Sequence, residues 1–276
     1  MITLGSSQNP PLVFLHGFLG SGKSWREIFQ INKLSEQSRN GDINVALQDQ
    51  YFCILPDLPG HGENTKLDFS TTISFDFVTD WLFHLLDEIP APKIHLVGYS
   101  LGGRVALHFA TRYPEQIHSL ILESANAGII DEAERARRLA EDSARAESML
   151  RDGMPAFVEK WYDMPLFASL KNHPEKISAI KEAAKQNNPR WMAKVIVELS
   201  PGLQTPLWDS LSELSFPVLL IAGAKDEKYV QVMQKMAEQI PSAQKNILPE
   251  AGHNVHAEQP EVYIELLKNF LSEVVE

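Results

Sequence analysis

A serine between two glycines lies where a predicted strand passes into a predicted helix. The pentapeptide GYSLG, residues 98–102, follows the apolar run 94–97 and precedes a helical pattern. This context is typical of the sharp turn that exposes a nucleophilic serine, here Ser100. Glycines are needed beside it because larger residues would collide with the closely packed backbone. Glycine-rich turns without catalysis look the same, so the interpretation depends on partner residues elsewhere in the chain.

An acid and a histidine downstream can complete this chemistry. A serine hydroxyl becomes an effective nucleophile or base at neutral pH only when a histidine accepts its proton and a carboxylate fixes the histidine tautomer. Asp226 follows the apolar run 218–222, and His253 lies in an Ala-Gly-His sequence after the next predicted strand. Taken singly, the aspartate could form a turn and the histidine could be a surface residue. Their order and context together predict a catalytic triad of Ser100, Asp226 and His253.

Backbone donors are the next requirement of such a site. A transition state with a negatively charged oxygen needs N–H groups that are aimed at it before the reaction begins. One is expected from the residue after the serine, Leu101, and the other from the loop after an earlier strand, at Phe18. His16 precedes Gly17 at the end of the predicted strand 12–15. We expect His16 to bond to loop backbone rather than to act as a second base.

Three further ionisable residues could be mistaken for catalytic groups. His256 comes shortly after His253, at the start of the last predicted helix, where we expect a capping or solvent-exposed role. Asp57 and His61 lie in the loop 56–62 after a different strand, and we expect them to be structural. The histidines are dispersed over loops without the paired spacing of metal ligands, so no metal site is predicted.

The elements that must position these residues alternate along the chain. Short apolar runs, separated by amphipathic stretches such as 72–89, are typical of an α/β fold with a mostly parallel central sheet and helices on both faces. We predict strands at 12–15, 51–55, 94–97, 119–122, 218–222 and 244–248.

One long interruption breaks this rhythm. From about 128 to 210 the strand pattern gives way to charged and aromatic helical sequence, and it resumes at Phe216. We therefore predict a single domain, 1–276, with an inserted helical cap at 128–210 that lies over the strand ends. The polar segment 35–50 is expected to be a surface excursion without chemistry of its own.

Composition limits the partners and the compartment. The 276 residues carry a formal net charge of −11, which disfavours nucleic acid and anionic membranes because both repel an acidic surface. A small anionic substrate would need arginines at the site. The single cysteine, Cys53, lies in an apolar run and is expected to be a core residue. With no apolar stretch long enough to span a membrane, the sequence predicts a cytoplasmic protein without membrane insertion.

These motifs together resemble one family of the α/β-hydrolase superfamily over essentially the whole chain. The family is 2-succinyl-6-hydroxy-2,4-cyclohexadiene-1-carboxylate synthase, of menaquinone and phylloquinone biosynthesis. Four core segments carry the resemblance: 16–22 (HGFLGSG), 58–62 (LPGHG), 98–104 (GYSLGGR) and 251–254 (AGHN). Three cap segments are similar as well: 134–138 (ERARR), 161–170 (WYDMPLFASL) and 200–204 (SPGLQ).

The resemblance implies a lyase that needs no cofactor. Pyruvate would be eliminated from a succinylated cyclohexene carboxylate bearing an enolpyruvyl group, without consumption of water. Ser100, polarised by the other two members of the triad, would remove a ring proton, and the two backbone donors would stabilise the developing enolate-like oxygen. The sequence leaves the oligomeric state open and is compatible with a monomer.

The resemblance also suggests which residues bind the substrate. Arg104 and Arg138 match arginines of the family, and a guanidinium can bind a carboxylate through two hydrogen bonds. Arg104 could instead form a surface ion pair, and the neighbours of Arg138 leave open which cap arginine faces the substrate. Tyr99 and Trp161 match pocket residues of the family, although aromatic packing between cap and core is the simpler role for each.

Two other classes of function remain open at this point. A hydrolase of esters, thioesters or carbon–carbon bonds would use the same triad with Ser100 as a true nucleophile. The arginines and the cap segments favour the lyase, because an esterase for neutral substrates needs no cations beside its serine. A hydrolase fold that serves only as a binding module is disfavoured by the complete triad and the loop that supplies the second backbone donor.

Overall fold

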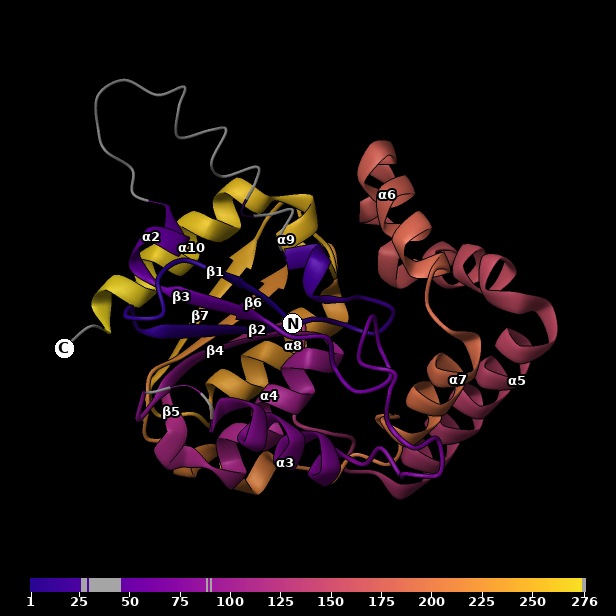
Figure 1. Ribbon diagram of the computed structural model, residues 1–276, viewed down its shortest axis with the longest axis horizontal. Coiled ribbons are helices and arrows are strands. Elements are labelled where there is room, and N and C mark those ends of the chain that lie inside the picture. The colour runs from indigo at the N-terminus through magenta and orange to yellow at the C-terminus, as the bar shows by residue number, and fades with distance from the viewer. Residues whose placement is uncertain (26–28, 30–45, 88, 90, 275–276) are drawn as a thin grey trace.

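The computed structural model describes residues 1–25, 29, 46–87, 89 and 91–274, and its centre is a single twisted sheet (Figure 1). The strands lie in the order β1-β3-β2-β4-β5-β6-β7, and every neighbouring pair is parallel except β1 with β3. Their bounds are Ile2–Leu4 (β1), Pro11–Leu15 (β2), Phe52–Leu55 (β3), Ile94–Tyr99 (β4), Ile117–Glu123 (β5), Val218–Gly223 (β6) and Ala243–Leu248 (β7).

All six predicted strands are present, and the mostly parallel sheet is confirmed. Strand β1 is an addition, because three residues give no periodic pattern that a sequence reading could detect. It pairs antiparallel with β3 along the sheet edge, where Ile2 lies opposite Leu55. Cys53 of β3 is fully buried, as expected, and burial raises the pKa of its thiol to about 12.

Helices cover both faces of the sheet, so the strands are apolar on both sides (Figure 1). Alternate residues of β2 show this directly. Val13 and Leu15 join the core under one layer of helices, and Leu12 and Phe14 join the core under the other. The first layer contains α3 (Phe75–Leu86), α4 (Leu101–Arg112) and α8 (Glu227–Ala237), and the second contains α2 (Leu47–Gln50), α9 (Val255–Glu258) and α10 (Pro260–Glu273).

Two local boundaries differ from the sequence pattern. Helix α3 begins only at Phe75, because Ser74 caps it by accepting a hydrogen bond from the backbone N–H of Phe77. The segment 35–50 was expected to lie on the surface. Residues 35–45 are outside the described part of the chain, and the remainder forms α2, in which Leu47 is fully buried.

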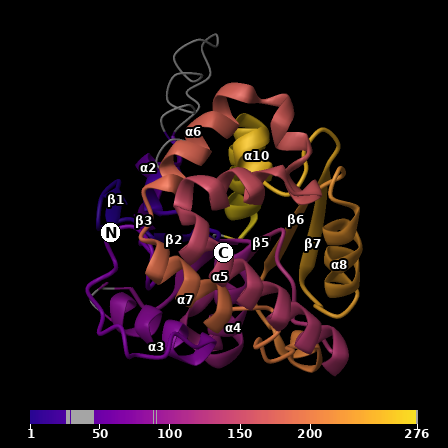
Figure 2. The ribbon, with the colours of Figure 1, turned by 90° about the vertical axis from the view of Figure 1, so that its right-hand side faces the viewer.

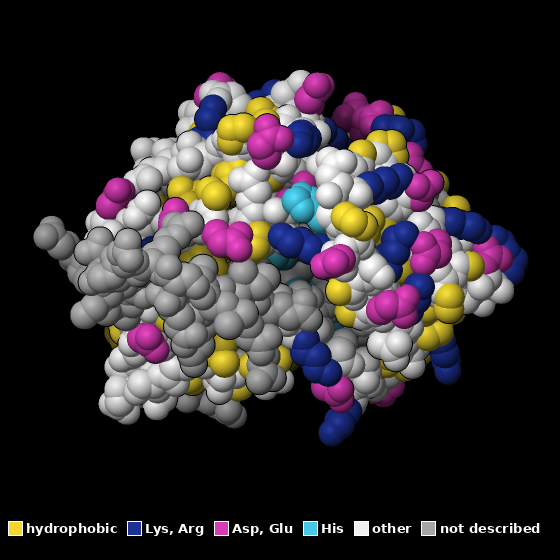
Figure 3. All heavy atoms as spheres, turned by 90° about the horizontal axis from the view of Figure 1, so that it is seen from above, with side chains coloured by type: hydrophobic (Ala, Val, Ile, Leu, Met, Phe, Trp, Pro, Cys, Tyr) yellow, Lys and Arg dark blue, Asp and Glu magenta, His cyan; other side chains and the backbone are white. Residues whose placement is uncertain are grey.

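Between β5 and β6 the chain forms three helices that lie in front of the strand ends (Figure 2). They are α5 (Glu132–Asp163), α6 (Pro174–Lys185) and α7 (Pro189–Glu198). Helix α5 is interrupted at Gly153, whose φ of 82° is left-handed, and Pro155 follows the break. On the surface of this region, acidic and basic side chains alternate (Figure 3). None of the described helices is long and apolar enough to span a membrane.

A buried carboxylate joins the first cap helix to the segment after α7. Asp142 is fully buried and accepts hydrogen bonds from Arg138 Nε at 2.8 Å, Arg145 Nη1 at 2.6 Å and Ser200 Oγ at 2.7 Å. Both guanidiniums keep about a third of their surface in water, so the carboxylate carries most of the cost of burial. Three charge-assisted or hydroxyl bonds offset that cost and fix how the cap segments meet.

We expect Asp142→Ala to destabilise the protein by about 2 to 4 kcal/mol, because two arginines and a hydroxyl lose their shared acceptor inside the cap. Urea unfolding followed by tryptophan fluorescence measures the change. The matched control is Asp163→Ala, which removes an ion pair with Lys171 that is open to solvent and should leave the unfolding midpoint in place. Equal effects of the two substitutions would show that the buried cluster does not hold the cap.

Candidate active site

The strand-to-helix turn at Ser100 has the geometry that its glycines suggest. Ser100 lies between the end of β4 and the start of α4 with φ 51° and ψ −108°, a conformation that few residues other than glycine adopt. A Cβ atom on Gly98 would lie 2.5 Å from the carbonyl oxygen of Gly102, and one on Gly102 would lie 2.2 Å from that of Leu15. The backbone can turn this sharply only because both flanking positions lack side chains.

The structure brings Ser100, His253 and Asp226 together in one line of hydrogen bonds. His253 Nδ1 lies 2.7 Å from Asp226 Oδ2, and His253 Nε2 lies 3.1 Å from Ser100 Oγ. With the proton on Nδ1 donated to the carboxylate, Nε2 is free to accept the serine proton. The histidine is buried, with the ring of Tyr229 4.7 Å from its own. This geometry can activate a serine as nucleophile or as base.

Two backbone N–H groups border the serine. Neither the Phe18 nor the Leu101 N–H donates a hydrogen bond to any residue in the described part of the chain, so both are available to a ligand oxygen. The loop that carries Phe18 is held by His16, whose Nδ1 donates to the Gly17 carbonyl at 2.8 Å and whose Nε2 accepts from the Leu58 N–H at 3.0 Å. The structural role expected for His16 is confirmed.

The loop 56–62 is structural too, as the sequence indicated. Asp57 accepts hydrogen bonds from the backbone N–H groups of Gly22 at 2.8 Å and Glu63 at 2.9 Å. His61 is fully buried with its ring 4.9 Å from that of His16. Burial and the neighbouring histidine lower the pKa of His61 well below its usual value, so it stays uncharged.

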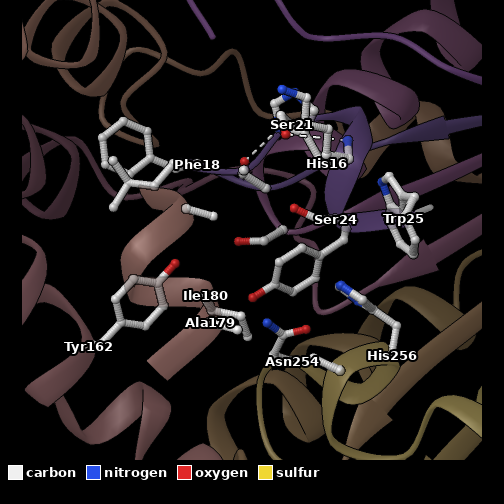
Figure 4. Close-up of a pocket in the computed structure, with 18 of the residues that line it drawn as sticks. His16, Phe18, Ser21, Ser24, Trp25, Tyr162, Ala179, Ile180, Asn254 and His256 are labelled. Atoms are coloured by element: carbon white, nitrogen blue, oxygen red, sulfur yellow. Dashed lines mark hydrogen bonds between the residues drawn. The ribbon is translucent and has the colours of Figure 1, made fainter. Parts of the chain in front are cut away.

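Ser100 opens into a cavity of about 560 Å³ between the sheet and the cap (Figure 4). Its cap wall includes Trp161, Tyr162 and Ile180. The Trp161 ring lies 5.1 Å from that of Phe18, so cap and core meet across the cavity. The walls are largely apolar, with a few hydroxyls and amides that could orient a ligand. No group of three potential metal ligands occurs among the described residues.

The predicted binding residues separate into two groups. Trp161 and Tyr99 both line the cavity, and Tyr99 lies almost wholly buried with its ring 5.6 Å from that of His253. Arg104 and Arg138 do not line it. The expectation that Arg104 reaches the cavity from its position on α4 is therefore not met in this conformation of the protein.

Arg104 has an unusual environment for a cation. Its side chain is buried, one guanidinium nitrogen donates to the Leu199 carbonyl at 2.9 Å, and the charge lies 5.3 Å from the ring centre of Phe75. No carboxylate of the described residues forms an ion pair with it. Burial lowers the pKa of Arg104 to about 10, and since that is above neutral pH the group stays charged.

Among the three clustered cap arginines, Arg138 faces inward. It donates to the buried Asp142, whereas Arg137 is largely exposed and pairs with acids of its own helix surface, and Arg135 lies near Glu132. The choice between these arginines could not be made from the sequence, because it depends on the side of α5 that meets the rest of the cap.

The role expected for His256 is wrong. It neither caps a helix with its side chain nor faces solvent. It is buried, and its Nδ1 lies 2.7 Å from Oε2 of Glu123, a fully buried carboxylate at the end of β5. The sequence contained one signal that could have revealed this pair, namely a charged residue directly after the predicted strand 119–122.

The model of the alpha/beta hydrolase fold family matches residues 10–260. The chain is 36% identical to a Bacillus subtilis protein to which 2-succinyl-6-hydroxy-2,4-cyclohexadiene-1-carboxylate synthase activity is attributed, over 98% of this chain and 93% of that protein. It is 31% identical to the synthase of that name from Serratia proteamaculans, over 97% and 95% of the two chains. The solved structure of MenH from S. aureus is 35% identical, with a TM-score of 0.88 over 97% of this chain and 95% of that one.

We expect Gly102→Ala to slow the reaction of Ser100 with a serine-directed phosphonate by on the order of 100-fold, because the added methyl group would displace the turn from the Leu15 carbonyl. Mass spectrometry of the labelled protein measures the rate. Gly153→Ala is the control, since its strained φ costs stability but the nearest heavy atom to the new methyl group is 3.8 Å away, in the cap. Unchanged labelling of the Gly102 variant would refute the steric account of the turn.

Proposed function

Because the chain belongs to the α/β-hydrolase-fold family, and within it to the family of 2-succinyl-6-hydroxy-2,4-cyclohexadiene-1-carboxylate synthases, we propose that it is a pyruvate-eliminating lyase. Its substrate would be 2-succinyl-5-enolpyruvyl-6-hydroxy-3-cyclohexene-1-carboxylate, in menaquinone or phylloquinone biosynthesis. The observation that carries the proposal is a similarity that extends over nearly the whole chain, cap included. The cap forms one wall of the cavity, where enzymes that share a triad differ in substrate.

The triad would act as the base of the elimination. Ser100 Oγ removes a ring proton while its own proton passes to His253 Nε2, and Asp226 stabilises the resulting imidazolium. The electron pair of the broken carbon–hydrogen bond enters the ring system, and the carbon–oxygen bond to the enolpyruvyl group breaks. The departing enolpyruvate takes up a proton and becomes pyruvate. The 3.1 Å separation of Ser100 Oγ from His253 Nε2 supports direct proton transfer between them.

The enolate-like oxygen that develops would be bound by the Phe18 and Leu101 N–H groups. Both donors are without a partner among the described residues, and one follows Ser100 directly. Preformed donors of this kind need no rearrangement when charge develops, which is why they lower the barrier. No metal or organic cofactor takes part in this proposal.

Cations for a substrate with several carboxylates would come from Arg104 and Arg138, with Trp161 and Tyr99 as cavity walls. A buried guanidinium without a carboxylate partner, as at Arg104, costs free energy that a bound anion would recover. Since Arg104 does not line the cavity, its use requires the side chain or the adjoining segment near Leu199 to move when substrate binds. Arg138 would have to share its guanidinium between the substrate and Asp142.

The partner would be a small anionic molecule, and the protein would act in the cytoplasm. All groups invoked above belong to one chain, so a monomer suffices for the chemistry. The buried thiol of Cys53 is compatible with a reducing compartment.

Hydrolysis of an ester or thioester is the second candidate. The arrangement of Ser100 and His253 fits a nucleophile as well as it fits a base, because in both cases the serine proton passes to Nε2. The two functions differ in their product, since only the lyase releases pyruvate without consuming water.

We expect the protein to release pyruvate when the enolpyruvyl substrate is made freshly from isochorismate and 2-oxoglutarate, with a coupled dehydrogenase as the readout. Ser100→Ala and His253→Ala should lower the rate by on the order of 1000-fold or more, because each removes a member of the proton path. Thermal unfolding of the variants confirms that they are folded. Absence of pyruvate with wild-type protein, together with turnover of a p-nitrophenyl ester, would identify the hydrolase instead.

A second prediction concerns Arg104→Met, which keeps most of the length of the side chain but removes its charge. Apparent substrate affinity should fall by about 2 to 5 kcal/mol, because a buried cation no longer meets a carboxylate. Stability in urea should stay constant or rise, since the charge has no carboxylate partner in the free protein. Unchanged substrate affinity together with a lower free energy of unfolding would show that Arg104 has only a structural role.

A further inference from the structure

Among the described residues, one buried ionisable pair has no role in the proposed elimination, although it borders the same cavity. Glu123 ends β5 and is fully buried, and His256 is the second residue of α9 and is 5% exposed. His256 lines the cavity into which Ser100 opens, and Glu123 does not. The pair therefore presents an imidazole to the ligand and keeps a carboxylate behind it.

The carboxylate fixes the orientation of the imidazole. Both oxygens of Glu123 lie within hydrogen-bond distance of His256 Nδ1, at 2.7 and 2.9 Å, and one also accepts from the backbone N–H of His256 at 3.1 Å. The ring is further held between Trp25, at 4.3 Å, and Tyr99, at 4.7 Å between centroids. Nε2 is thus left as the ring atom that forms no hydrogen bond to any described residue.

Polar side chains gather around His256 in a cavity whose walls are otherwise largely apolar. Figure 4 shows His256 pointing into the cavity, with Ser24, Trp25 and Asn254 around it. Asn254 is buried and lines the same space, where its side-chain amide could donate through Nδ2. An imidazole, an amide and a hydroxyl that converge on one space are a set of donors suited to an oxyanion with two acceptor atoms.

The charge of the pair favours the same ligand. Since Nδ1–H is already donated to Glu123, a second proton on Nε2 makes the imidazole a cation, and the buried carboxylate balances that charge within the protein. Burying a cationic donor costs less free energy when a carboxylate lies next to it than when the donor is isolated. A carboxylate on the cavity side would then bond to Nε2–H through a charge-assisted hydrogen bond.

We propose that His256 binds a carboxylate of the substrate through Nε2, together with Ser24 and Asn254, and that Glu123 acts as the positioning residue of His256. The identity of the substrate rests on the function proposed above, whereas the class of ligand, a small carboxylate, does not. The site would orient the substrate from the side of the cavity formed by α9.

Two substitutions of His256 distinguish a role in ligand binding from a purely structural role. His256→Asn keeps a donor at the place of Nδ1, toward Glu123, and leaves nothing at the place of Nε2. His256→Gln keeps a donor near Nε2 and leaves the carboxylate without its ring partner. We expect KM to rise on the order of tenfold in the Asn variant, with a smaller change in kcat, and to rise less in the Gln variant.

A purely structural role predicts the opposite order, with the Asn variant close to wild type because Glu123 keeps its partner. That order, or a fall in kcat at unchanged KM, would overturn the proposal. Glu123→Gln should also raise KM, because a neutral amide holds the His256 ring in place less firmly than the carboxylate does. Ser24→Ala, which removes a single hydroxyl from the cavity wall, keeps the test decisive if the histidine variants do not fold.

A readout without turnover tests the site independently of the lyase reaction. Sodium pyruvate at millimolar concentration should slow the labelling of Ser100 by a serine-directed phosphonate in wild-type protein. This protection should weaken by on the order of tenfold in His256→Asn. The control is His84→Gln, an exposed histidine of α3 that does not line the cavity and should leave protection unchanged.

The two readouts distinguish the failure of each idea. Protection that depends on His256, without release of pyruvate from the substrate, would keep the carboxylate site and overturn the lyase. Release of pyruvate with equal KM and equal protection in the wild type and the Asn variant would keep the lyase and overturn the carboxylate site. Labelling of wild-type Ser100 that pyruvate does not slow would also overturn it.

Discussion

Everything at the centre of this molecule follows from how closely the turn at Ser100 packs against the neighbouring strand. The Leu15 carbonyl lies where a side chain of Gly102 would be, so β2 and α4 approach each other through backbone alone. That approach places the loop after β2, with its Phe18 N–H, beside the serine. It also forces Ser100 into a left-handed conformation that exposes its hydroxyl at the strand end. The histidine and the cap are then arranged around a serine whose position is already fixed.

The ionisable groups near the cap and those near α9 have different partners. Toward the cap, Arg104 is a buried cation that bonds to a carbonyl and has no carboxylate partner among the described residues. Toward α9, His256 has a buried carboxylate directly behind it. A buried cation without a carboxylate partner gains most from an arriving anion, whereas an imidazole held by a carboxylate is better oriented. A substrate with several carboxylates would meet His256 in the cavity, whereas it would meet Arg104 only after a movement of that side chain or of the segment near Leu199.

What could be read from the sequence depended on how far apart the interacting residues are. The turn at Ser100 is a local pattern, and Asp226 and His253 each follow a recognisable strand, so the triad and the sheet were predictable. The contact of Arg104 with Leu199 joins residues 95 positions apart and depends on how the cap folds back. The pairing of Glu123 with His256 spans 133 positions and requires the place of β5 within the sheet. Amphipathic spacing could not supply either of these, and it misassigned His256.

The break in α5 at Gly153 divides the cap into a part that is anchored and a part that lines the cavity. Asp142, before the break, pins the first part to the segment after α7, whereas Trp161 and Tyr162, after it, form the cavity wall. Because a left-handed residue followed by Pro155 interrupts the helical hydrogen bonds, a change in the wall is not transmitted rigidly to the anchor. Substitutions in the cavity wall can therefore change the shape of the cavity while the contacts of Asp142 stay in place.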